Sequence, residues 1–327
     1  MSQTVLVTGG AGYVGSHACK ALARAGYTPV VLDNLVYGHR ENVRWGPLIQ
    51  GDMADHGLLD SIFSKYEPEA VLHFAAWAYV SESVSAPGKY YRNNVSGTLT
   101  LLETMRDHGC RNIVFSSSCA TYGVPETTPI TESTPQRPIN PYGWSKFMVE
   151  RMLEDFECAH GMRHASLRYF NAAGADPEGE LGEDHTPETH LIPLVLEAAL
   201  DSNRSIAVFG DDYPTEDGSC VRDYVHVTDL AEAHIQALEY IRNHDSGAFN
   251  LGTGRGHTVK QIIHAARRAT GRHLSERIES RRPGDPPALY ADNTLARQAL
   301  GWEPRFTDIE ETISHAWTWL NKLRKTP

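Results

Sequence analysis

Residues 8–15 read Thr8-Gly9-Gly10-Ala11-Gly12-Tyr13-Val14-Gly15 and directly follow an apolar run at residues 5–7. The glycines at 9, 12 and 15 have the spacing G-x-x-G-x-x-G. The first permits a tight turn, the second lets the backbone approach a pyrophosphate, and the third lets a helix pack closely on a strand. The amide groups at the start of that helix can bind phosphate without a basic side chain. A glycine triplet alone could be a structural turn, but this one stands between strand and helix patterns and predicts a dinucleotide-binding loop.

The next two apolar runs end in acidic residues. The run at residues 29–32 ends at Asp33, whose carboxylate can accept hydrogen bonds from a ribose 2′-hydroxyl and repels a 2′-phosphate. NAD is therefore favoured over NADP. The third run reaches Gly51-Asp52-Met53, where an adenine ring could lie against Asp52 and Met53. Asp52 could instead cap the helix that begins near Asp55.

The distribution of apolar runs in the first half indicates an α/β fold. Continuous apolar strands separated by helices are typical of a parallel sheet covered on both faces, so we expect a Rossmann-type, doubly wound parallel sheet. Strands are expected at residues 5–8, 29–32, 70–74, 112–115 and 164–167, and helices at residues 17–24, 58–65, 97–107 and 142–160.

The second half is less regular and richer in Pro, Gly and acidic residues. Helices are expected at residues 191–200, 229–241, 259–270 and 308–322, and short strands near 206–209, 224–227 and 249–251. We expect a smaller C-terminal α/β lobe that caps the carboxyl ends of the strands, where the ligand crevice of such folds lies. The predicted division is an NAD-binding domain at residues 1–172 and a substrate-binding domain at residues 173–327, partly interleaved.

A tyrosine and a lysine lie four residues apart in residues 141–146, Pro-Tyr-Gly-Trp-Ser-Lys. On a helix, Tyr142 and Lys146 fall on one face. A nearby ammonium and a positively charged nicotinamide lower the pKa of a phenol, and a shift from near 10 to about 7 takes about 4 kcal/mol. The alternative is an amphipathic helix with an exposed lysine and a half-buried tyrosine.

Three serines, at residues 116–118, end the fifth apolar run and precede this helix in the chain. Ser118 has the best phase to share the hydrogen bond of a substrate hydroxyl with Tyr142, although serines at strand ends are otherwise usually turn formers. Because the pair follows a dinucleotide loop, Asp33 and these serines, the sequence predicts a redox site for a hydroxyl-bearing carbon, with Tyr142, Lys146 and Ser118 as catalytic residues.

Composition excludes several classes of protein. The 327 residues are 41% hydrophobic and 22% charged, as in globular proteins, and the net charge of -11 argues against a general role on nucleic acid or an anionic membrane. No apolar run approaches the roughly 18 residues of a membrane helix. The five cysteines are far apart with no pair at metal-ligand spacing, and we expect no metal site. No export-signal pattern precedes the first strand, so we expect the cytoplasm.

Further motifs extend along nearly the whole chain. They are His73-Phe74-Ala75-Ala76, Tyr90-Tyr91-Arg92-Asn93-Asn94-Val95, Arg168-Tyr169-Phe170-Asn171, Asp212-Tyr213-Pro214-Thr215-Glu216-Asp217-Gly218, Arg222-Asp223-Tyr224 and Arg281-Arg282-Pro283-Gly284-Asp285. With the glycine loop and the Tyr142–Lys146 pair, the chain resembles the UDP-glucose 4-epimerase family of the extended short-chain dehydrogenase/reductases. The stretch from Asp212 to Asp223 is the part most specific to 4-epimerases.

The resemblance implies a tightly held NAD, 4-epimerisation of a UDP-sugar between UDP-glucose and UDP-galactose through a 4-keto sugar, and a homodimer. It implies cofactor contacts by Gly9, Gly12, Tyr13, Val14, Gly15, Asp33, Asn34, Asp52, Met53, Phe74, Ala75, Ala76, Asn93, Ser116, Tyr142, Lys146 and Tyr169. It implies substrate contacts by Ser118, Tyr142, Asn171, His190, Leu191, Ala207, Phe209, Arg222, Tyr224, Arg282, Asp285 and Leu289. Arg222 and Arg282 could instead be paired with acids in structural bridges.

Three residues depart from the family pattern. Ala78 stands where familiar members have a lysine near the cofactor, and His190 where an asparagine often meets the substrate diphosphate. Leu289 stands where a tyrosine or a cysteine gates N-acetylated sugars, so UDP-N-acetylhexosamines and UDP-pentoses are alternative substrates.

Two other activities share the NAD-binding loop with epimerases. A sugar-nucleotide dehydratase needs an added acid, whereas Cys119-Ala120-Thr121 follows the serines. A non-catalytic NAD-binding sensor keeps the glycine loop and loses the Tyr142–Lys146 pair, which is present here.

Overall fold

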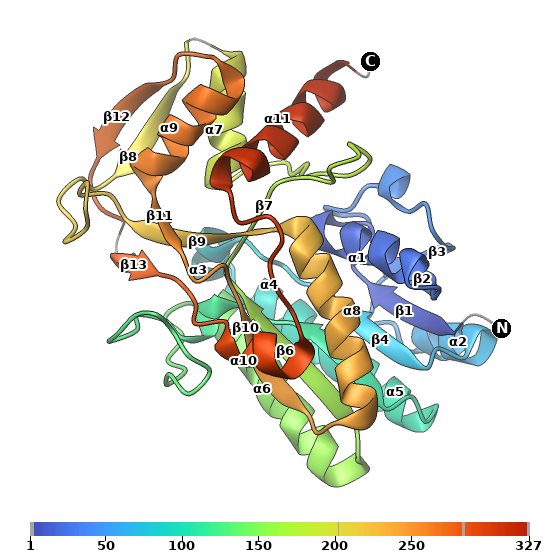
Figure 1. Ribbon diagram of the computed structural model, residues 1–327. Coiled ribbons are helices and arrows are strands. Elements are labelled where there is room, and N and C mark those ends of the chain that lie inside the picture. Colours follow the sequence, from blue (N-terminus) through green and yellow to red (C-terminus); the bar gives the residue numbers. More distant parts are fainter. Residues whose placement is uncertain (1–2, 202, 283–284, 326–327) are drawn as a thin grey trace.

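The computed structural model describes residues 3–201, 203–282 and 285–325 (Figure 1). Its largest element is a seven-stranded, wholly parallel sheet with the order β10-β6-β5-β4-β1-β2-β3. The strand order reverses between β1 and β4, which is the switch point of a doubly wound sheet. The strands are β1 (Thr4–Thr8), β2 (Thr28–Asp33), β3 (Leu48–Gln50), β4 (Ala70–His73), β5 (Asn112–Ser116), β6 (Arg163–Tyr169) and β10 (Gly247–Leu251).

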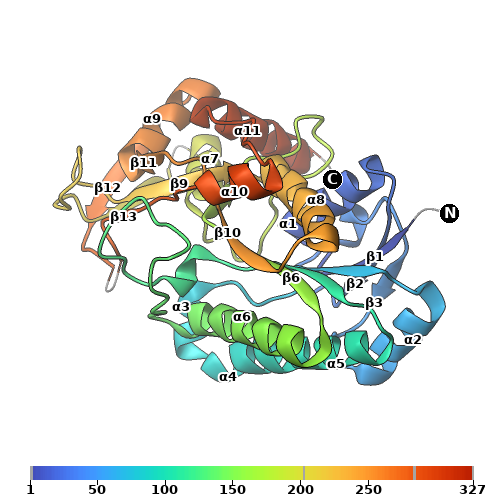
Figure 2. The ribbon, with the colours of Figure 1, turned by 60° about the horizontal axis from the view of Figure 1, so that its bottom comes forward.

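Helices cover both faces of this sheet (Figure 2). Leu22 of α1 (Tyr13–Arg24) packs on one face together with α8 (Val227–Asn243) and α10 (Thr294–Leu300). Leu59, Leu101 and Val149 come from the helices of the other face, which are α2 (His56–Tyr66), α5 (Thr98–Asp107) and α6 (Pro141–His160). Short helical segments lie before α5, at α3 (Val80–Ser85), α4 (Pro87–Tyr90) and the π-helical turn Tyr91–Gly97, and 3-10 turns lie at Arg40–Asn42 and Cys119–Thr121. The doubly wound α/β fold expected from the apolar runs is confirmed.

The second half of the chain interleaves with the first. It leaves the sheet after β6, returns through α8 to add β10 beside β6, and later adds α10 to the same face. The remaining second half forms a smaller lobe at the carboxyl ends of the strands (Figure 1). The predicted boundary near residue 172 stays a prediction.

The smaller lobe combines two short sheets and three helices. In one sheet β9 (Val221–His226) pairs with β7 (Asn171–Ala173), β11 (Gly256–Thr258) and β13 (Ala288–Leu289); in the other, β8 (Ser205–Phe209) pairs with β12 (Ser275–Glu279). Its core is built from α7 (Leu191–Leu200), α9 (Val259–Thr270) and α11 (Ile309–Lys325), which bury residues such as Val195, Ile262 and Ile313.

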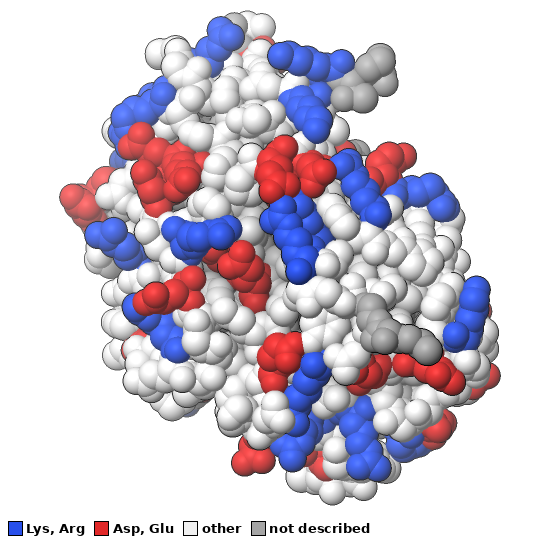
Figure 3. All heavy atoms as spheres, turned by 45° about the vertical axis from the view of Figure 1, so that its right-hand side comes forward, with Lys and Arg blue, Asp and Glu red and all other residues white. Residues whose placement is uncertain are grey.

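The surface carries mixed charge. On the face drawn in Figure 3, Lys and Arg side chains are interspersed with Asp and Glu. Within the described ranges, no helix is both long and apolar enough to cross a membrane.

Candidate active site

The glycine loop joins β1 to α1 as the sequence predicted. Gly9 has a φ of +74°, and a Cβ atom there would lie 2.6 Å from the amide nitrogen of Ala75. A Cβ on Gly15 would lie 2.2 Å from the carbonyl oxygen of Gly9. Both positions therefore require glycine. Gly12 precedes α1 without a side-chain cap, so backbone amides remain available at the helix start to bind an anion.

Asp33 lies at the carboxyl end of β2, beside this loop. Its carboxylate accepts hydrogen bonds from the amides of Ala11 (3.0 Å) and Leu35 (2.8 Å). Burial raises its pKa, while these two amides act to lower it. The side chain lines the cavity described below, so a ribose bound over the loop can reach it.

Asp52 does not cap α2, which corrects one of the two interpretations of this residue. Asp55 is the cap, because its carboxylate accepts a hydrogen bond from the amide of Leu58. Asp52 accepts from the amide of Ala54 in a local turn and lines the cavity next to Met53.

Tyr142 and Lys146 lie in the first turns of α6. The helix begins sharply because Asn140 accepts a hydrogen bond from the amide of Gly143 and Pro141 takes the first helical position. Tyr142 is 8% exposed and Lys146 3%, so the alternative of an exposed lysine on an amphipathic helix is wrong. Lys146 Nζ donates to the carbonyl oxygen of Ser116 at 2.7 Å and lies 5.9 Å from the centre of the Tyr142 ring.

The pKa values of this pair move in the opposite directions to those that base catalysis needs. Burial raises the pKa of Tyr142 above its ordinary value, and a hydrogen bond with Ser118 only partly offsets this. Burial lowers the pKa of Lys146 to about 7, against the attraction of Glu150. The chain alone therefore holds the phenol neutral, and the expected phenolate depends on the positive nicotinamide as well as on Lys146.

The serines of residues 116–118 take different places. Ser118 lines the cavity, accepts a hydrogen bond from the amide of Ala120 and contacts Tyr142. Ser116 lies beneath the cavity, where its hydroxyl donates to Tyr169 Oη at 3.2 Å and its carbonyl oxygen anchors Lys146. Ser118 therefore has the geometry expected of the serine that shares the substrate hydroxyl.

One cavity of about 1600 Å³ joins these features, at the carboxyl ends of the strands and under the smaller lobe. Pockets for one small ligand are typically about 300–1,000 Å³, so this one has room for a dinucleotide and a second nucleotide. Of the residues predicted to bind cofactor or substrate, Ser116 and Lys146 do not line it. Those that do are Gly9, Gly12, Tyr13, Val14, Gly15, Asp33, Asn34, Asp52, Met53, Phe74, Ala75, Ala76, Asn93, Ser118, Tyr142, Tyr169, Asn171, His190, Leu191, Ala207, Phe209, Arg222, Tyr224, Arg282, Asp285 and Leu289.

The two arginines predicted to bind the substrate differ in their contacts. Arg222 forms an ion pair with Asp285 and donates to the carbonyl oxygen of Pro286 at 3.0 Å. Arg282 instead stacks on Phe209, 3.9 Å from the ring centre. Thus the structural-bridge alternative describes Arg222, while the guanidinium of Arg282 lines the cavity over an aromatic ring. Pro283 and Gly284 of the same motif lie outside the described residues.

The three departures from the family pattern all line the cavity. His190 precedes α7, and contacts with Glu183 and Glu188 raise its pKa to about 10 although burial acts to lower it. Leu289 lies on β13 beside Arg222 of β9. Ala78 leaves the cavity wall without a cation at its position.

Several residues of the site were not predicted from the sequence. Tyr37, Trp77 and Tyr79 form an aromatic group on the cavity wall, with Tyr37 edge-on to both of the others. Glu183, His185 and Glu188 line the wall beside His190. The acids and histidines that gather within residues 183–190 are the one signal in the sequence that points to this wall.

The family model that matches this chain covers residues 5–252 and describes the NAD dependent epimerase/dehydratase family. The chain belongs to this family. A UDP-glucose 4-epimerase of Rhizobium leguminosarum bv. trifolii is 52% identical over 97% of each chain. The crystal structure of UDP-glucose 4-epimerase from Brucella ovis in complex with NAD is 52% identical, covers 97% of this chain and 98% of that one, and superposes with a TM-score of 0.94.

A third relative shows the same fold at lower identity. It is the UDP-glucose-4-epimerase of Stenotrophomonas maltophila with bound NAD and formylated UDP-arabinopyranose, 38% identical, with a TM-score of 0.96 over 99% of this chain and 100% of that one. As a member of the NAD dependent epimerase/dehydratase family, the chain uses NAD, and the loop with Asp33 fits that cofactor.

Proposed function

We propose that this chain is an NAD-dependent isomerase that interconverts UDP-glucose and UDP-galactose through a transient 4-keto sugar. The observation that carries the proposal is the single cavity that runs from the glycine loop past Tyr142 to α7 and Arg282. Tyr142 lies on the cavity wall between the part suited to NAD and the part suited to a UDP-sugar. The curated relatives of about half identity over nearly the whole chain carry the same activity in their names.

NAD, when bound, supplies a reversible hydride acceptor for carbon C4 of the sugar. Tyr142 would take the proton of the 4-hydroxyl as carbon C4 is oxidised to the 4-keto sugar. It would give the proton back when the 4-keto group is reduced on its other face. The two halves cancel as redox steps, so no external oxidant is consumed.

The chain's own residues prepare this proton transfer. Ser118 is in hydrogen-bond contact with Tyr142, so its hydroxyl can share the hydrogen bond of the sugar 4-hydroxyl during the transfer of the proton to Tyr142 and back. Lys146, held at 2.7 Å on the carbonyl oxygen of Ser116, keeps a cation below the phenol and in reach of a nicotinamide ribose. Because burial raises the pKa of Tyr142, we infer that the phenol becomes a base when the oxidised cofactor is bound.

The smaller lobe supplies the contacts for the UDP group. Arg282 presents a guanidinium to the cavity, and such a fork matches phosphate oxygens. Leu191 begins α7, so the free amides of the helix start face a diphosphate. Arg222 and Asp285 form one unit, and we propose that this unit contacts the substrate as a pair.

The test is direct. Purified protein with NAD should convert UDP-galactose to an equilibrium mixture with UDP-glucose, followed by nuclear magnetic resonance of the sugar protons. Tyr142→Phe should abolish turnover, lowering the rate at least about 10²-fold, and leave the melting temperature within a few degrees. Normal NAD binding with UDP-galactose left unchanged would mean that the chain is a cofactor sensor instead.

The proposal also includes a homodimer, the cytoplasm and galactose metabolism, which the family resemblance implies. Light scattering on the eluted peak of a sizing column tests the dimer. A fully active monomer at micromolar concentration would contradict the proposed homodimer and leave the proposed reaction unaffected.

A further inference from the structure

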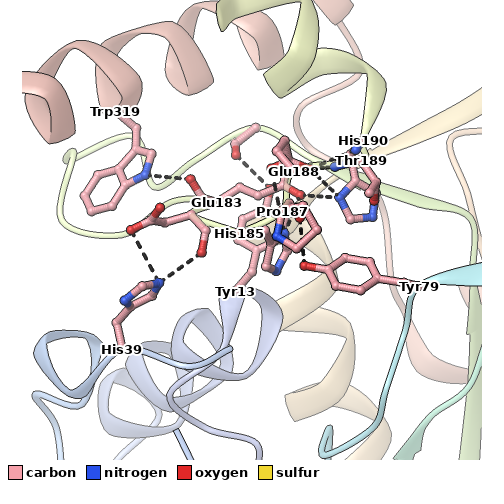
Figure 4. Close-up of polar contacts among 12 residues, drawn as sticks. Tyr13, His39, Tyr79, Glu183, His185, Pro187, Glu188, Thr189, His190 and Trp319 are labelled. Carbon is pink, nitrogen blue, oxygen red and sulfur yellow. Dashed lines mark hydrogen bonds and ion pairs between the residues drawn. The ribbon is translucent and has the colours of Figure 1, made fainter. Parts of the chain in front are cut away.

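Two glutamates and two histidines of one loop form a compact cluster on the cavity wall (Figure 4). The donor atoms of Glu183, His185, Glu188 and His190 all lie within 4.8 Å of one another. The described residues contain one other such group, but Lys20 Nζ already lies 2.6–2.8 Å from each of its three carboxylates. Among the described residues, no lysine or arginine forms an ion pair with the first cluster, so its histidines are the positive partners of the two carboxylates.

The contacts within the cluster cross between the two carboxylates. His190 Nδ1 lies 2.7 Å from Glu183 Oε1 and 3.0 Å from Glu188 Oε1. His185 Nδ1 lies 3.1 Å from Glu183 Oε1 and 3.8 Å from Glu188 Oε2. Each imidazole thus faces both carboxylates. In two independent ion pairs, each imidazole would face only one carboxylate.

These separations fit the corners of a tetrahedron around a zinc-sized ion. Bonds of about 2.0–2.2 Å to nitrogen and oxygen place neighbouring donors of a tetrahedral site about 3.3–3.6 Å apart. The four carboxylate–imidazole separations run from 2.7 to 3.8 Å and all donor atoms lie within 4.8 Å of one another, so small side-chain rearrangements bring one atom of each residue to that geometry.

The donor set also selects the kind of ion. Two imidazole nitrogens suit Zn²⁺ and its neighbours in the transition series, whereas Ca²⁺ and Mg²⁺ prefer oxygen ligands and higher coordination numbers. A divalent cation displaces the protons of the imidazoles to solvent, and two carboxylates with two neutral imidazoles around it make a unit of zero net charge. This matters because the side chains of Glu183 and Glu188 are only 7% and 8% exposed, and buried charge is costly unless it is neutralised.

The loop that carries the cluster is fixed from both lobes (Figure 4). Trp319 of α11 donates to the carbonyl oxygen of Glu183 at 3.0 Å, and Tyr79 donates to that of Pro187 at 3.0 Å. His39 Nε2 lies 3.0 Å from the carbonyl oxygen of Asp184. These three contacts hold the main chain of the loop from outside, and within the loop Glu188 Oε1 accepts hydrogen bonds from the amides of Thr189 and His190 at 2.6 and 2.8 Å.

We propose that Glu183, His185, Glu188 and His190 bind one structural Zn²⁺ ion. Four protein donors fill a tetrahedral shell and leave no open position, which is the pattern of structural rather than catalytic zinc. The ion joins the loop to the start of α7, opposite Tyr13 of α1, whose ring lies 6.3 Å from that of His185. The metal thus ties the wall between the cofactor and substrate regions. This proposal departs from the sequence expectation of no metal site, which rested on the spacing of the cysteines.

The experiment is metal titration of the full chain, without an affinity tag and stripped by a chelator. One equivalent of Zn²⁺ should bind per chain, measured by calorimetry and by elemental analysis after dialysis, and should raise the melting temperature by several degrees. Co²⁺ in the same site should give the strong visible bands of tetrahedral cobalt without the near-ultraviolet band of a cobalt–thiolate bond. Absence of binding at micromolar free Zn²⁺ would overturn the proposal.

Matched variants separate this site from fortuitous binding. His185→Gln should weaken Zn²⁺ by more than tenfold, since even an outer partner of a ligand is worth about 10–100-fold. His273→Gln, which removes an exposed histidine between α9 and β12, should bind like the parent chain. His185→Cys keeps a zinc ligand, so it should retain metal and add the thiolate band, which also guards against a variant that merely folds poorly. Unchanged binding by His185→Gln, or a thiolate band in the parent chain, would assign the metal elsewhere.

Discussion

Replacing Glu150 by alanine should cost this fold about 3–5 kcal/mol, because it leaves a buried guanidinium without its partner. Glu150 is 2% exposed and Arg168 5%. Arg168 donates to both carboxylate oxygens, with Nη2 at 2.6 Å and Nε at 3.0 and 3.2 Å. Ser117 and Gln136 complete the shell at 2.5 and 2.8 Å. Since whole domains are stable by only about 5–15 kcal/mol, the loss is a large fraction of the total.

Urea unfolding followed by circular dichroism measures the effect. With a slope near 3 kcal/mol/M, the midpoint should fall by about 1–2 M. The double variant Glu150→Leu with Arg168→Met replaces the pair by apolar side chains and should recover much of the loss, because buried pairs often exchange for apolar residues at little cost. A loss below about 1 kcal/mol in Glu150→Ala, or no recovery in the double variant, would refute this reasoning.

The same carboxylate also acts on Lys146, which we propose as a catalytic residue. Burial lowers the pKa of Lys146 to about 7, and Glu150 opposes this by attraction. In Glu150→Gln, which keeps the shape of the side chain, the pKa of Lys146 should fall further. The ammonium is then lost at a lower pH, so the alkaline limb of the pH–rate profile should move to lower pH. An alkaline limb that stays in place would show that Lys146 does not act as a cation.

Three further predictions concern cofactor choice, sugar choice and acid stability. Asp33→Ser removes charge-assisted hydrogen bonds of about 1.5–3 kcal/mol and should weaken NAD about 10–100-fold while narrowing the preference over NADP, as measured by fluorescence titration of both cofactors. Leu289→Tyr places a bulkier, aromatic side chain beside Arg222 and should reduce turnover of UDP-N-acetylhexosamines more than that of UDP-galactose in a substrate panel. An unchanged ratio of the two turnover rates would show that Leu289 does not act as a gate. Between pH 7.5 and 5.5 four buried histidines should each destabilise the fold by about 1 kcal/mol, because their lowered pKa keeps them neutral in the fold while the unfolded chain takes up protons below pH 6.5. Burial is the main cause of the lowered pKa in each histidine, and the pKa falls to about 3 or 4. The four residues are His17, His73, His226 and His234. Urea midpoints that do not fall on acidification would contradict this last prediction.

The sequence was informative where local chemistry decides the structure. The glycine loop, Asp33 at the end of its strand and the helix expected at residues 142–160 follow from turn, strand and helix patterns within a few residues, and each lies where these patterns placed it. The carboxyl ends of parallel strands meet at one edge of the sheet, so the convergence of the cofactor residues followed from the fold class.

Contacts between distant segments could not be predicted in this way. Nothing in the local pattern of Arg168 says that it pairs with Glu150 of α6, or that His234 of α8 lies 3.3 Å from Ser116. The pKa directions of Tyr142 and Lys146 depend on burial, which spacing on a helix does not reveal. The aromatic group of Tyr37, Trp77 and Tyr79 likewise forms only when two strand-end loops meet.

The position of β10 next to β6 has a consequence for how the chain is made. A ribosome releases six strands of the central sheet well before the seventh, because β10 ends at Leu251 and β6 ends at Tyr169. At a synthesis rate of about 5–20 residues per second, the backbone groups on the outer edge of β6 stay unpaired for several seconds. An unpaired strand edge can pair with another chain. The nascent protein therefore passes through an interval in which chaperones or low crowding must prevent this pairing. A premature stop between α7 and β10 would leave the edge of β6 unpaired and give a fragment prone to association instead of a smaller working domain.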